Sequence, residues 1–235
     1  MPEKISVITV VFNDSTHIEK TIQSVLSQNY SNVEYIIIDG ASTDGTLEIC
    51  KKYENQISKI ISEKDTGIYN AMNKGIQNST GEWIFFLNSG DIFFNDNAIS
   101  SVMSETINAD IIYGKAMTDN KEETFFSKRI TKSMFILERM ICHQAIFARR
   151  KVFDNNNFDE KYRIIADRVW LYNCYKQKYL IKPLEKTISV YDTSGVSSNI
   201  EKFDKESLAF LKSISVLWFV FAKIKRIFRI IKINK

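Results

Sequence analysis

An apolar run and an acid-bearing turn follow each other in the stretch Trp83-Ile84-Phe85-Phe86-Leu87-Asn88-Ser89-Gly90-Asp91. An apolar run that stops at small polar residues is typical of a buried strand that ends at the carboxyl edge of a sheet. Open α/β sheets bind ligands at that edge. Three more aspartates, Asp39, Asp65 and Asp167, follow or flank other predicted strands or helix starts. Several carboxylates at one edge predict a divalent cation that holds a phosphorylated ligand.

Strands and helices alternate on both sides of this stretch. Apolar, β-branched runs predict strands at 5–11, 33–38, 57–61 and 82–87. Apolar residues at helical spacing predict helices between them, so the first half of the chain is expected to form a parallel sheet covered by helices. Beyond residue 105 shorter strands are predicted at 111–113, 123–126, 142–148 and 188–191, with helices at 166–178 and from 202 to the end. The first half is expected to bind a nucleotide, and the mixed second half to complete the site.

The composition indicates a globular protein of a reducing compartment. The chain has 235 residues, of which 44% are hydrophobic, enough for one large domain with an appendage. The cysteines Cys50, Cys142 and Cys174 are far apart and odd in number, so neither a CxxC metal pair nor a disulfide framework is expected. No basic and apolar signal peptide precedes the first predicted strand.

The octet Asp39-Gly40-Ala41-Ser42-Thr43-Asp44-Gly45-Thr46 lies between a predicted strand and a predicted helix. Ser42, Thr43 and Asp44 are interpreted first as residues of a turn that caps the helix. Asp39 differs, because it closes the strand and can accept a hydrogen bond from a base or a ribose. An EF-hand is excluded, since Ala41 and Thr43 stand where its oxygen ligands would be.

Four segments come in an order and spacing that resemble family 2 inverting glycosyltransferases of the GT-A fold. They are Thr9–Asn13, the octet, Ser62–Gly75 and Leu87–Asp91, within a resemblance that covers about residues 4–195. It is nearest to bacterial enzymes that build capsule, O-antigen or exopolysaccharide repeat units. It implies an α/β fold with a Rossmann-like, mostly parallel nucleotide-binding half (1–105), a mixed acceptor half (106–200) and an amphipathic tail (201–235). The implied enzyme is a hexosyl- or N-acetylhexosaminyltransferase that uses a nucleotide-diphosphate sugar, most often a UDP-sugar.

The resemblance also implies which residues bind the donor nucleotide. Asp39 would pair with the base, most often uracil, and Asp65 would approach the base or the ribose. The segment Asp65-Thr66-Gly67 is equally typical of a helix N-cap, and both roles can hold, because a helix N-terminus favours anionic ligands. The full implied nucleotide-binding set is Thr9, Val11, Asn13, Asp39, Asp65, Gly67, Asn70, Lys74, Asn88 and Ser89.

Asp91 is the metal ligand that the resemblance implies. The Asp-x-Asp region of the family has two or three acids, but here Asn88 replaces the first and only Asp91 is a carboxylate. Mn²⁺ and Mg²⁺ commonly use one or two carboxylates together with phosphate oxygens, so one aspartate suffices. We therefore expect weak metal binding without the donor; the alternative is that Asp91 is a turn residue.

Asp167 matches the late acidic motif of the family, where an aspartate at a helix start is the general base. An inverting transfer needs one carboxylate near the acceptor hydroxyl. The second aspartate of the motif is Val169 here, and Arg168 could lower the basicity of Asp167 or bind pyrophosphate. The alternative for Asp167 is a helix N-cap.

His143 and Gln144 open the strand predicted at 142–148. Related sequences place a similar pair near the acceptor side of the pocket. His143 is therefore expected to stabilise the leaving phosphate or to contact a sugar; the alternative is a structural histidine.

The C-terminal stretch is apolar and then strongly basic. From Ser207 to Lys235 there is no acidic residue and there are seven basic ones. In a helix, which turns 100° per residue, basic and apolar residues would lie on opposite sides. The basic side would carry Lys225, Arg226, Arg229 and Lys232, and the apolar side would carry Ile224, Ile227, Phe228 and Ile231. The uninterrupted apolar run is about half the length of a membrane span. Residues 213–235 are therefore predicted to lie as a helix in an anionic membrane surface, the alternative being a helix docked on the domain with a solvated basic side.

These patterns predict a cytoplasmic enzyme, peripheral on the inner face of the cell membrane, with a lipid-linked or saccharide acceptor. Nucleic acid is not expected as a partner, because no stacking platform or RNA motif accompanies the basic residues. Two other functions stay open. A sugar nucleotidyltransferase would need a glycine-rich loop after the first strand, where Val11–Ser15 has no glycine. A non-catalytic, membrane-associated member is kept open by Asn88 and Val169. A dehydrogenase is excluded, since no GxGxxG follows a predicted strand.

Overall fold

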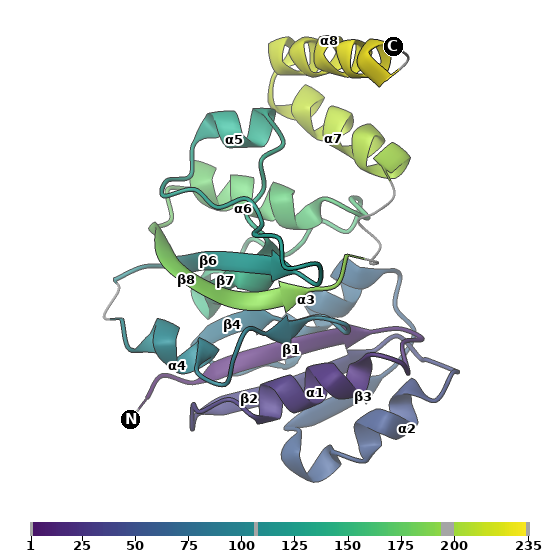
Figure 1. Ribbon diagram of the computed structural model, residues 1–235, viewed down its shortest axis with the longest axis vertical. Coiled ribbons are helices and arrows are strands. Elements are labelled where there is room, and N and C mark those ends of the chain that lie inside the picture. The colour runs from purple at the N-terminus through teal and green to yellow at the C-terminus, as the bar shows by residue number, and fades with distance from the viewer. Residues whose placement is uncertain (1, 106–107, 194–199, 234–235) are drawn as a thin grey trace.

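The computed structural model describes residues 2–105, 108–193 and 200–233. Within these ranges one sheet runs through the molecule with helices packed on its faces (Figure 1). The strands are β1 (Ile5–Val11), β2 (Val33–Asp39), β3 (Lys59–Ser62), β4 (Trp83–Phe86), β5 (Ile92–Phe93), β6 (Ile111–Thr118), β7 (Ile146–Arg149) and β8 (Ile181–Tyr191). The α-helices are α1 (Ile18–Leu26), α2 (Thr46–Lys51), α3 (Ile68–Asn78), α4 (Ala98–Met103), α5 (Lys132–Ile136), α6 (Ala166–Lys176), α7 (Ile200–Ile214) and α8 (Val216–Ile233). Short 3₁₀ helices lie at η1 (Glu54–Gln56), η2 (His143–Ala145) and η3 (Arg150–Val152).

The strand order is β3-β2-β1-β4-β7-β6-β8-β5. Strands β3, β2, β1 and β4 are parallel, as the alternation of the first half predicts. Strand β7 then runs antiparallel to β4 and to β6, while β8 runs parallel to β6. Consequently β6 and β8 end at the same edge as β4, and β7 begins there.

Strand β1 is buried on both faces, as its continuous apolar sequence predicts. Ile8 and Val10 point to the cluster formed with α3, α6 and α7, while Val7 and Val11 point to the cluster formed with α1 and α4. Helix α3 lies so close to the strand that a Cβ atom on Gly75 would lie 2.4 Å from Cγ2 of Ile8. Glycine is therefore required where α3 crosses β1.

Four predicted elements of the second half differ in the structure. Residues 123–126 form no strand; Glu123 makes a single antiparallel bridge with Met117. The predicted strand 142–148 starts as η2, and only its end belongs to β7. The predicted strand 188–191 is only the end of β8, which begins at Ile181. The first part of β8 is polar and has no strand pattern in its sequence, but it is extended because it pairs with β6. The predicted C-terminal helix is divided at Ser215 into α7 and α8.

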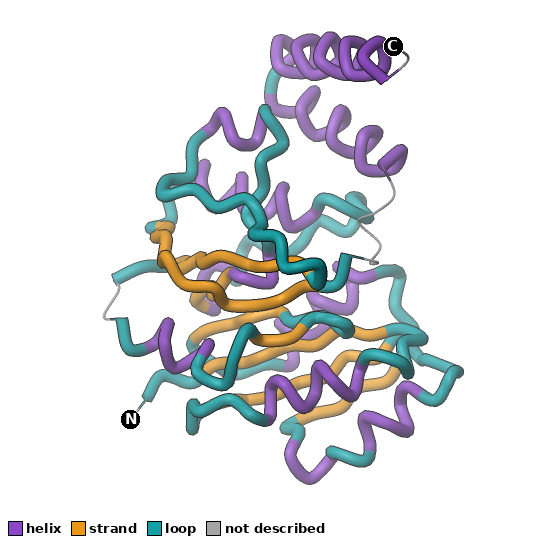
Figure 2. The backbone as a smooth tube through the Cα atoms, viewed as in Figure 1, coloured by secondary structure: helices purple, strands orange, loops and turns teal. Residues whose placement is uncertain are grey.

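Helices α7 and α8 lie at one end of the molecule, with α7 between α6 and α8 (Figures 1 and 2). Helix α7 buries Phe210 and Leu211, and Phe210 belongs to the same core cluster as α3 and α6. The boundary at residue 200 and the division into halves remain predictions, and the described part of the predicted tail ends at residue 233. No helix among the described residues has the length and apolar character that crossing a membrane would require.

Helix α8 also differs from the alternative considered above, a helix docked on the domain with its basic side in solvent. Arg226 points inward, where its guanidinium forms ion pairs with Glu138 at 2.5 Å and with Asp204 at 2.9 Å. Ile224, on the apolar side of the helix, is 47% exposed. Acids of α7 and of the segment after α5, Asp204 and Glu138, thus bring Arg226 to the interface, while Ile224 faces solvent.

Candidate active site

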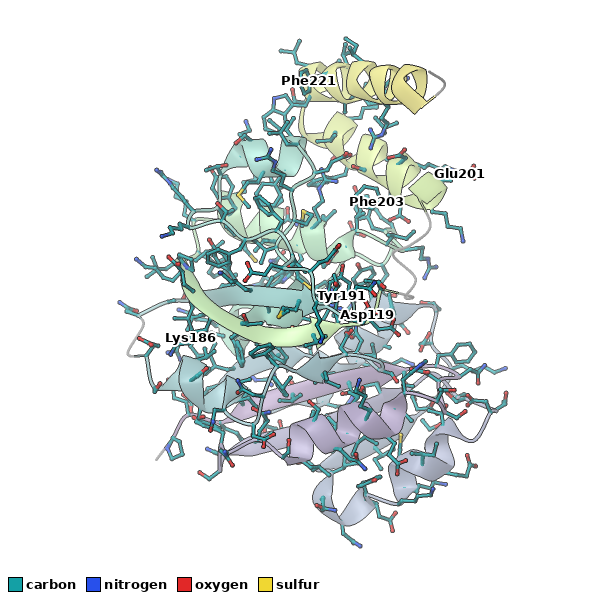
Figure 3. The ribbon with its side chains drawn as sticks, viewed as in Figure 1. Asp119, Lys186, Tyr191, Glu201, Phe203 and Phe221 are labelled. Carbon is teal, nitrogen blue, oxygen red and sulfur yellow. The ribbon has the colours of Figure 1, made fainter. Side chains whose placement is uncertain are left out.

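The topology brings distant segments to one edge of the sheet. The turn Asn88–Asp91 follows β4, and η2 immediately precedes β7, which is antiparallel to β4. Strand β8 ends at the same edge with Tyr191, which Figure 3 labels beside Asp119. Residues from the predicted donor and acceptor halves therefore meet at the carboxyl ends of the parallel strands.

Asp91 is buried at this edge. Its Oδ2 accepts a hydrogen bond from Nε2 of Gln144 at 2.9 Å, and its Oδ1 accepts one from the backbone N–H of Asp192 at 3.0 Å. Burial raises the pKa of Asp91 to about 6, although these two bonds and the charge of His143 act in the opposite direction. The Asp192 carboxylate lies beside Gly90 and adds to the rise by repulsion. Asp91 is thus a buried acid whose charge is incompletely compensated.

A chain of side chains connects the Asn88 turn to Asp167. Nδ2 of Asn88 lies 3.1 Å from Nε2 of His143, and Nδ1 of His143 lies 3.2 Å from Oδ2 of Asp167. Since a carboxylate only accepts hydrogen bonds, His143 carries a proton on Nδ1 and donates it to Asp167. The hydroxyl of Tyr69 lies 3.0 Å from Oδ1 of the same carboxylate.

This chain determines the ionisation of Asp167. Burial favours the neutral acid, but the hydrogen bond and charge of His143, the N–H of Arg168 and the Tyr69 hydroxyl together outweigh it and lower the pKa. The side chain remains 21% exposed. Asp167 lies in the first turn of α6 rather than at its N-cap, which is Ile165. A partly accessible, ionised carboxylate held by two neighbours can accept a proton from a bound hydroxyl group.

The octet after β2 is held by its own polar residues. Asp39 is completely buried, and its Oδ2 accepts hydrogen bonds from the hydroxyl of Ser62 at 2.6 Å and from the backbone N–H of Ser42 at 3.2 Å. Oδ1 of Asn13 accepts the N–H of Thr43 at 2.9 Å, which ties the end of β1 to the octet. Asp44 accepts hydrogen bonds from the backbone and hydroxyl of Thr46, the turn expected for it.

The segment at Asp65 lies against the octet. Oδ1 of Asp65 accepts the N–H of Gly67 at 2.9 Å, and a Cβ atom on Gly40 would lie 2.6 Å from Oδ2 of Asp65. Gly67 has φ +139°, a value that side chains disfavour, and it is the N-cap of α3 without a side-chain cap bond. The two loops therefore contact each other beside the ends of β2 and β3.

The other predicted nucleotide-binding residues lie around these loops. Thr9 and Val11 are buried, and the hydroxyl of Thr9 donates to the carbonyl of Leu87 at 2.7 Å. The amide of Asn70 donates to Glu160, while Lys74 forms an ion pair with Glu63 at 2.8 Å. The hydroxyl of Ser89 donates to Asp14 at 2.6 Å. Their roles in binding a nucleotide stay predictions.

Arg168 requires a correction. It is 1% exposed, and its guanidinium donates to the hydroxyl of Ser207 at 2.6 Å and to the carbonyl of Phe135. The guanidinium points into the contact with α7 and is not available to pyrophosphate, because its position on α6 lies on the packed side of the helix. Its backbone N–H donates to Oδ1 of Asp167 at 2.8 Å.

Three residues of the site were not predicted from the sequence. Asp192 follows directly after the strand predicted at 188–191, so an acid at a strand end was a usable signal. Tyr69 has the helical spacing of a core residue, and nothing in the sequence relates it to Asp167. Glu160 binds Asn70 and Asn73, a contact between segments 90 and 87 residues apart.

The residues at Asp91 are compatible with a cation. Asn88 Oδ1 is buried and has no hydrogen-bond partner among the described residues. It lies in the same turn as the Asp91 carboxylate, whose raised pKa reflects uncompensated burial. Carboxylate and amide oxygens suit Mg²⁺ and Mn²⁺. Within the described ranges no three His, Cys, Asp or Glu side chains group into a metal site, so such an ion would need oxygens from a ligand as well.

Comparison with known proteins gives consistent matches. The sequence profile described as "Glycosyl transferase family 2" matches residues 6–201. A "PGL/p-HBAD biosynthesis glycosyltransferase" of Mycobacterium bovis is 28% identical over 211 residues, which are 86% of this chain and 82% of that protein.

Solved structures match at the level of the fold. The crystal structure of S. aureus TarS 1-349 in complex with UDP-GlcNAc superposes with a TM-score of 0.70 at 20% identity, over 87% of this chain and 64% of that one. The mannosyltransferase PcManGT of Pyrobaculum calidifontis, in complex with GDP-Man and Mn²⁺, superposes with a TM-score of 0.66 at 13% identity, over 88% and 61%. The chain thus spans just under two thirds of these solved chains. The expected α/β fold of the GT-A type is confirmed.

Proposed function

The chain belongs to glycosyl transferase family 2, and from that membership we propose that it inverts the anomeric centre of a sugar as it moves the sugar from a UDP-sugar to a hydroxyl group. We place this reaction in the synthesis of a bacterial cell-surface glycan, with a lipid-linked or saccharide acceptor. The observation that carries the proposal is the hydrogen-bonded chain from Asn88 through His143 to Asp167. It joins the donor-side turn to a carboxylate suited to be the base.

Asp167 is the proposed general base. Its lowered pKa keeps it ionised at neutral pH, and His143 and Tyr69 orient its two oxygens. The acceptor hydroxyl gives its proton to Asp167 while its oxygen forms a bond to the anomeric carbon. The bond from that carbon to the diphosphate oxygen breaks on the opposite face, and the nucleoside diphosphate leaves with the electron pair.

The octet and the Asp65 loop are the proposed nucleoside site. Asn13, Asp39 and Asp65 lie on loops that contact one another at the ends of the parallel strands. Among the solved structures of this fold, TarS is in complex with UDP-GlcNAc and PcManGT with GDP-Man, so the fold accommodates both nucleotides. Uracil is the proposed base.

Mn²⁺ or Mg²⁺ is the proposed cofactor. Asp91 and Asn88 Oδ1 would hold it together with phosphate oxygens of the donor. A divalent cation bound there would offset the negative charge of the diphosphate. The PcManGT complex contains Mn²⁺ beside GDP-Man, which supports this choice.

An anionic membrane surface is the proposed partner of α8. Its outward face carries Val216, Leu217, Val220, Phe221 and Ile224, which are 47–79% exposed. Figure 3 labels Phe221 on this helix at the end of the molecule. Besides Arg226, which pairs with Glu138 and Asp204, six basic and no acidic residues lie between Ser207 and Lys235, a charge that complements anionic lipids.

The experiment for the membrane proposal is vesicle flotation. We expect the protein to float with phosphatidylglycerol vesicles and not with phosphatidylcholine vesicles, and we expect the double variant Leu217→Ser/Phe221→Ser to lose binding. Leu180→Ser is the control, because Leu180 is 40% exposed elsewhere on the molecule. Equal flotation of the double variant would contradict the membrane proposal. Self-association at equal protein concentration would assign the face to a second copy of the chain.

The experiment for the proposed activity is calorimetric titration of UDP and GDP, with Mn²⁺ and then with a chelator. We expect metal-dependent UDP binding that Asp39→Ala and Asp91→Ala each weaken. Asp154→Ala, at an exposed acid, is the control and should not change the Kd. A preference for GDP would contradict the UDP proposal while keeping the reaction class. Binding of neither nucleotide would contradict the transfer proposal and favour a non-catalytic member with a degenerate site.

A further inference from the structure

Helix α6 begins without a cap of its own. The backbone N–H groups at the start of a helix need external acceptors, which a neighbouring Ser, Thr, Asp or Asn normally supplies. The N-cap of α6 is Ile165, which makes no side-chain cap bond. The helix that carries Asp167 therefore depends on another element for the order of its first turn.

Glu206 of α7 instead holds the three residues that lead into the helix. Its Oε1 accepts the N–H of Arg163 at 2.8 Å, and its Oε2 accepts the N–H groups of Ile164 at 2.9 Å and Ile165 at 3.3 Å. The partners are 41 to 43 residues apart in the sequence. A carboxylate at this place also opposes the positive end of the helix dipole. One side chain thus holds three consecutive backbone groups in front of α6.

Helix α7 can hold residues 163–165 in place because it packs tightly on α6. Ser207 is completely buried and accepts a hydrogen bond from Arg168 of α6 at 2.6 Å. The ring of Phe210 packs edge-on against Tyr172 of α6, with centroids 5.4 Å apart. The hydroxyl of Ser207 donates to Glu138, which also pairs with Arg226 of α8.

The segment that Glu206 holds reaches both sides of the site. The carbonyl of Ile164 lies 2.8 Å from the hydroxyl of Tyr69, the same hydroxyl that lies 3.0 Å from Asp167. The guanidinium of Arg163 donates to the carbonyl of Thr66, next to Gly67 of the Asp65 loop. A shift of residues 163–165 would therefore displace the neighbours of the proposed base and of the proposed nucleoside loop.

We propose that Glu206 is a positioning residue for the transfer reaction, which orients Asp167 by holding the start of α6. This inference rests on the proposed role of Asp167 as general base. If Glu206 has this role, α7 contributes to the transfer reaction. The proposed membrane contact then belongs to α8 alone. Glu206 acts through the backbone and does not touch the substrate.

The test compares Glu206→Ala, Glu206→Gln and Glu201→Gln in the full chain. Glu201 is an exposed acid on the same helix, and Figure 3 shows it pointing away from the core, so it is the matched control. We expect Glu206→Ala to lower kcat about 10- to 100-fold, the loss typical of a misplaced catalytic group, with the UDP Kd changed less than about threefold. Glu206→Gln keeps one acceptor oxygen and should recover part of kcat. The control should match the wild type.

Hydrogen exchange separates positioning from general loss of structure. In Glu206→Ala, exchange should rise at residues 163–169, while the amides of β1 stay protected. An unchanged kcat, or a loss of kcat that follows the unfolded fraction, would overturn the inference. Transfer that survives in Asp167→Asn would instead contradict the proposed function, so the two failures are distinct.

Discussion

The donor side and the acceptor side of the site are built differently. On the donor side, polar residues follow their own strands and bond to adjacent turns; the Asp39 carboxylate accepts the N–H of Ser42, three residues away. On the acceptor side, Asp167 is held by Tyr69, which is 98 residues away, and by His143, which is 24 residues away. The difference teaches that the proposed nucleoside loops are held by one another at the ends of the strands, whereas the geometry of the proposed base depends on packing between helices.

The largest effect is expected from Asp167→Asn. The amide cannot accept the proton of the acceptor hydroxyl, so kcat should fall about 10²- to 10⁴-fold. The UDP Kd should stay near the wild-type value, because the donor loops are built independently. The measurement pairs transfer assays with calorimetry. If Asp167→Asn weakened UDP binding as much as it lowered kcat, the donor and acceptor sides would not be independent.

The next effect concerns His143, which connects the two sides. In His143→Ala, the hydrogen bond and charge that lower the pKa of Asp167 are lost, so this pKa should rise. Since the base must be ionised, the acid limb of the pH profile of kcat/KM should move to higher pH. We expect kcat to fall about 10- to 100-fold through lost orientation of the carboxylate.

His143→Asn is the matched variant, because its amide N–H can stand near the position of Nδ1 and keep one donor to Asp167. Its acid limb should lie between those of the wild type and His143→Ala. A profile that does not move in either variant would mean that His143 does not control Asp167.

Gly75→Ala tests the packing of the donor side without touching its polar residues. The new Cβ atom would lie 2.4 Å from Cγ2 of Ile8, and overpacking of this kind lowers the free energy of unfolding by about 1–3 kcal/mol. Urea denaturation measures the effect, and Gln77→Ala on the exposed side of α3 is the control. The UDP Kd of the folded protein should be unchanged. A loss of binding without a loss of stability would show that α3 shapes the nucleoside site directly.

The smallest effect is expected from Glu34→Gln, at the edge of the sheet opposite the site. Burial disfavours the Glu34 carboxylate, but hydrogen bonds from Ser6, Thr80 and Lys4 outweigh it and lower the pKa from 4.5 to about 2. Because the pKa is lowered in the folded state, the stabilisation is present above about pH 4.5 and is lost as the pH falls toward 2. The variant should lose about 1 kcal/mol at pH 7.

Denaturation at a series of pH values checks this last prediction. The difference between wild type and Glu34→Gln should shrink between pH 4.5 and pH 2. A difference that is constant over this interval would place the stabilisation in the shape of the side chain rather than in its charge. The transfer rate of the folded variant should equal that of the wild type.

The parallel strands and the order of the site loops could be predicted from the sequence. Strand β1 has the predicted bounds 5–11, and β4 ends one residue before the predicted limit, because unbroken apolar runs followed by polar turns mark buried strands. The second half was harder. Strand β8 contains Lys, Pro and Glu between Ile181 and Ile188, so its sequence does not predict a strand there. The segment is a strand because it pairs with β6.

Some residues of the candidate site could likewise be predicted from the sequence, and others could not. Asp91 and Asp167 could be proposed from the sequence because each lies near the start or end of a predicted element, and Asp192 could have been proposed by the same rule. Arg168 was misplaced, because adjacent helical residues point to different sides and the sequence does not say which side is packed. Glu206 gave no signal, since a lone glutamate in an amphipathic helix is usually a solvated residue.

The sequence by itself determined the alternation of strands and helices in the first half and the polar residues that follow its buried strands, because these depend on periodicity and turn chemistry within a few residues. The tertiary structure alone decided that Arg226 rather than Ile224 faces α7, that Tyr69 and His143 hold Asp167, and that Glu206 holds the segment before α6. Those outcomes depend on which distant groups share a buried interface, where a polar group must find a partner or remain costly. No local pattern encodes that choice.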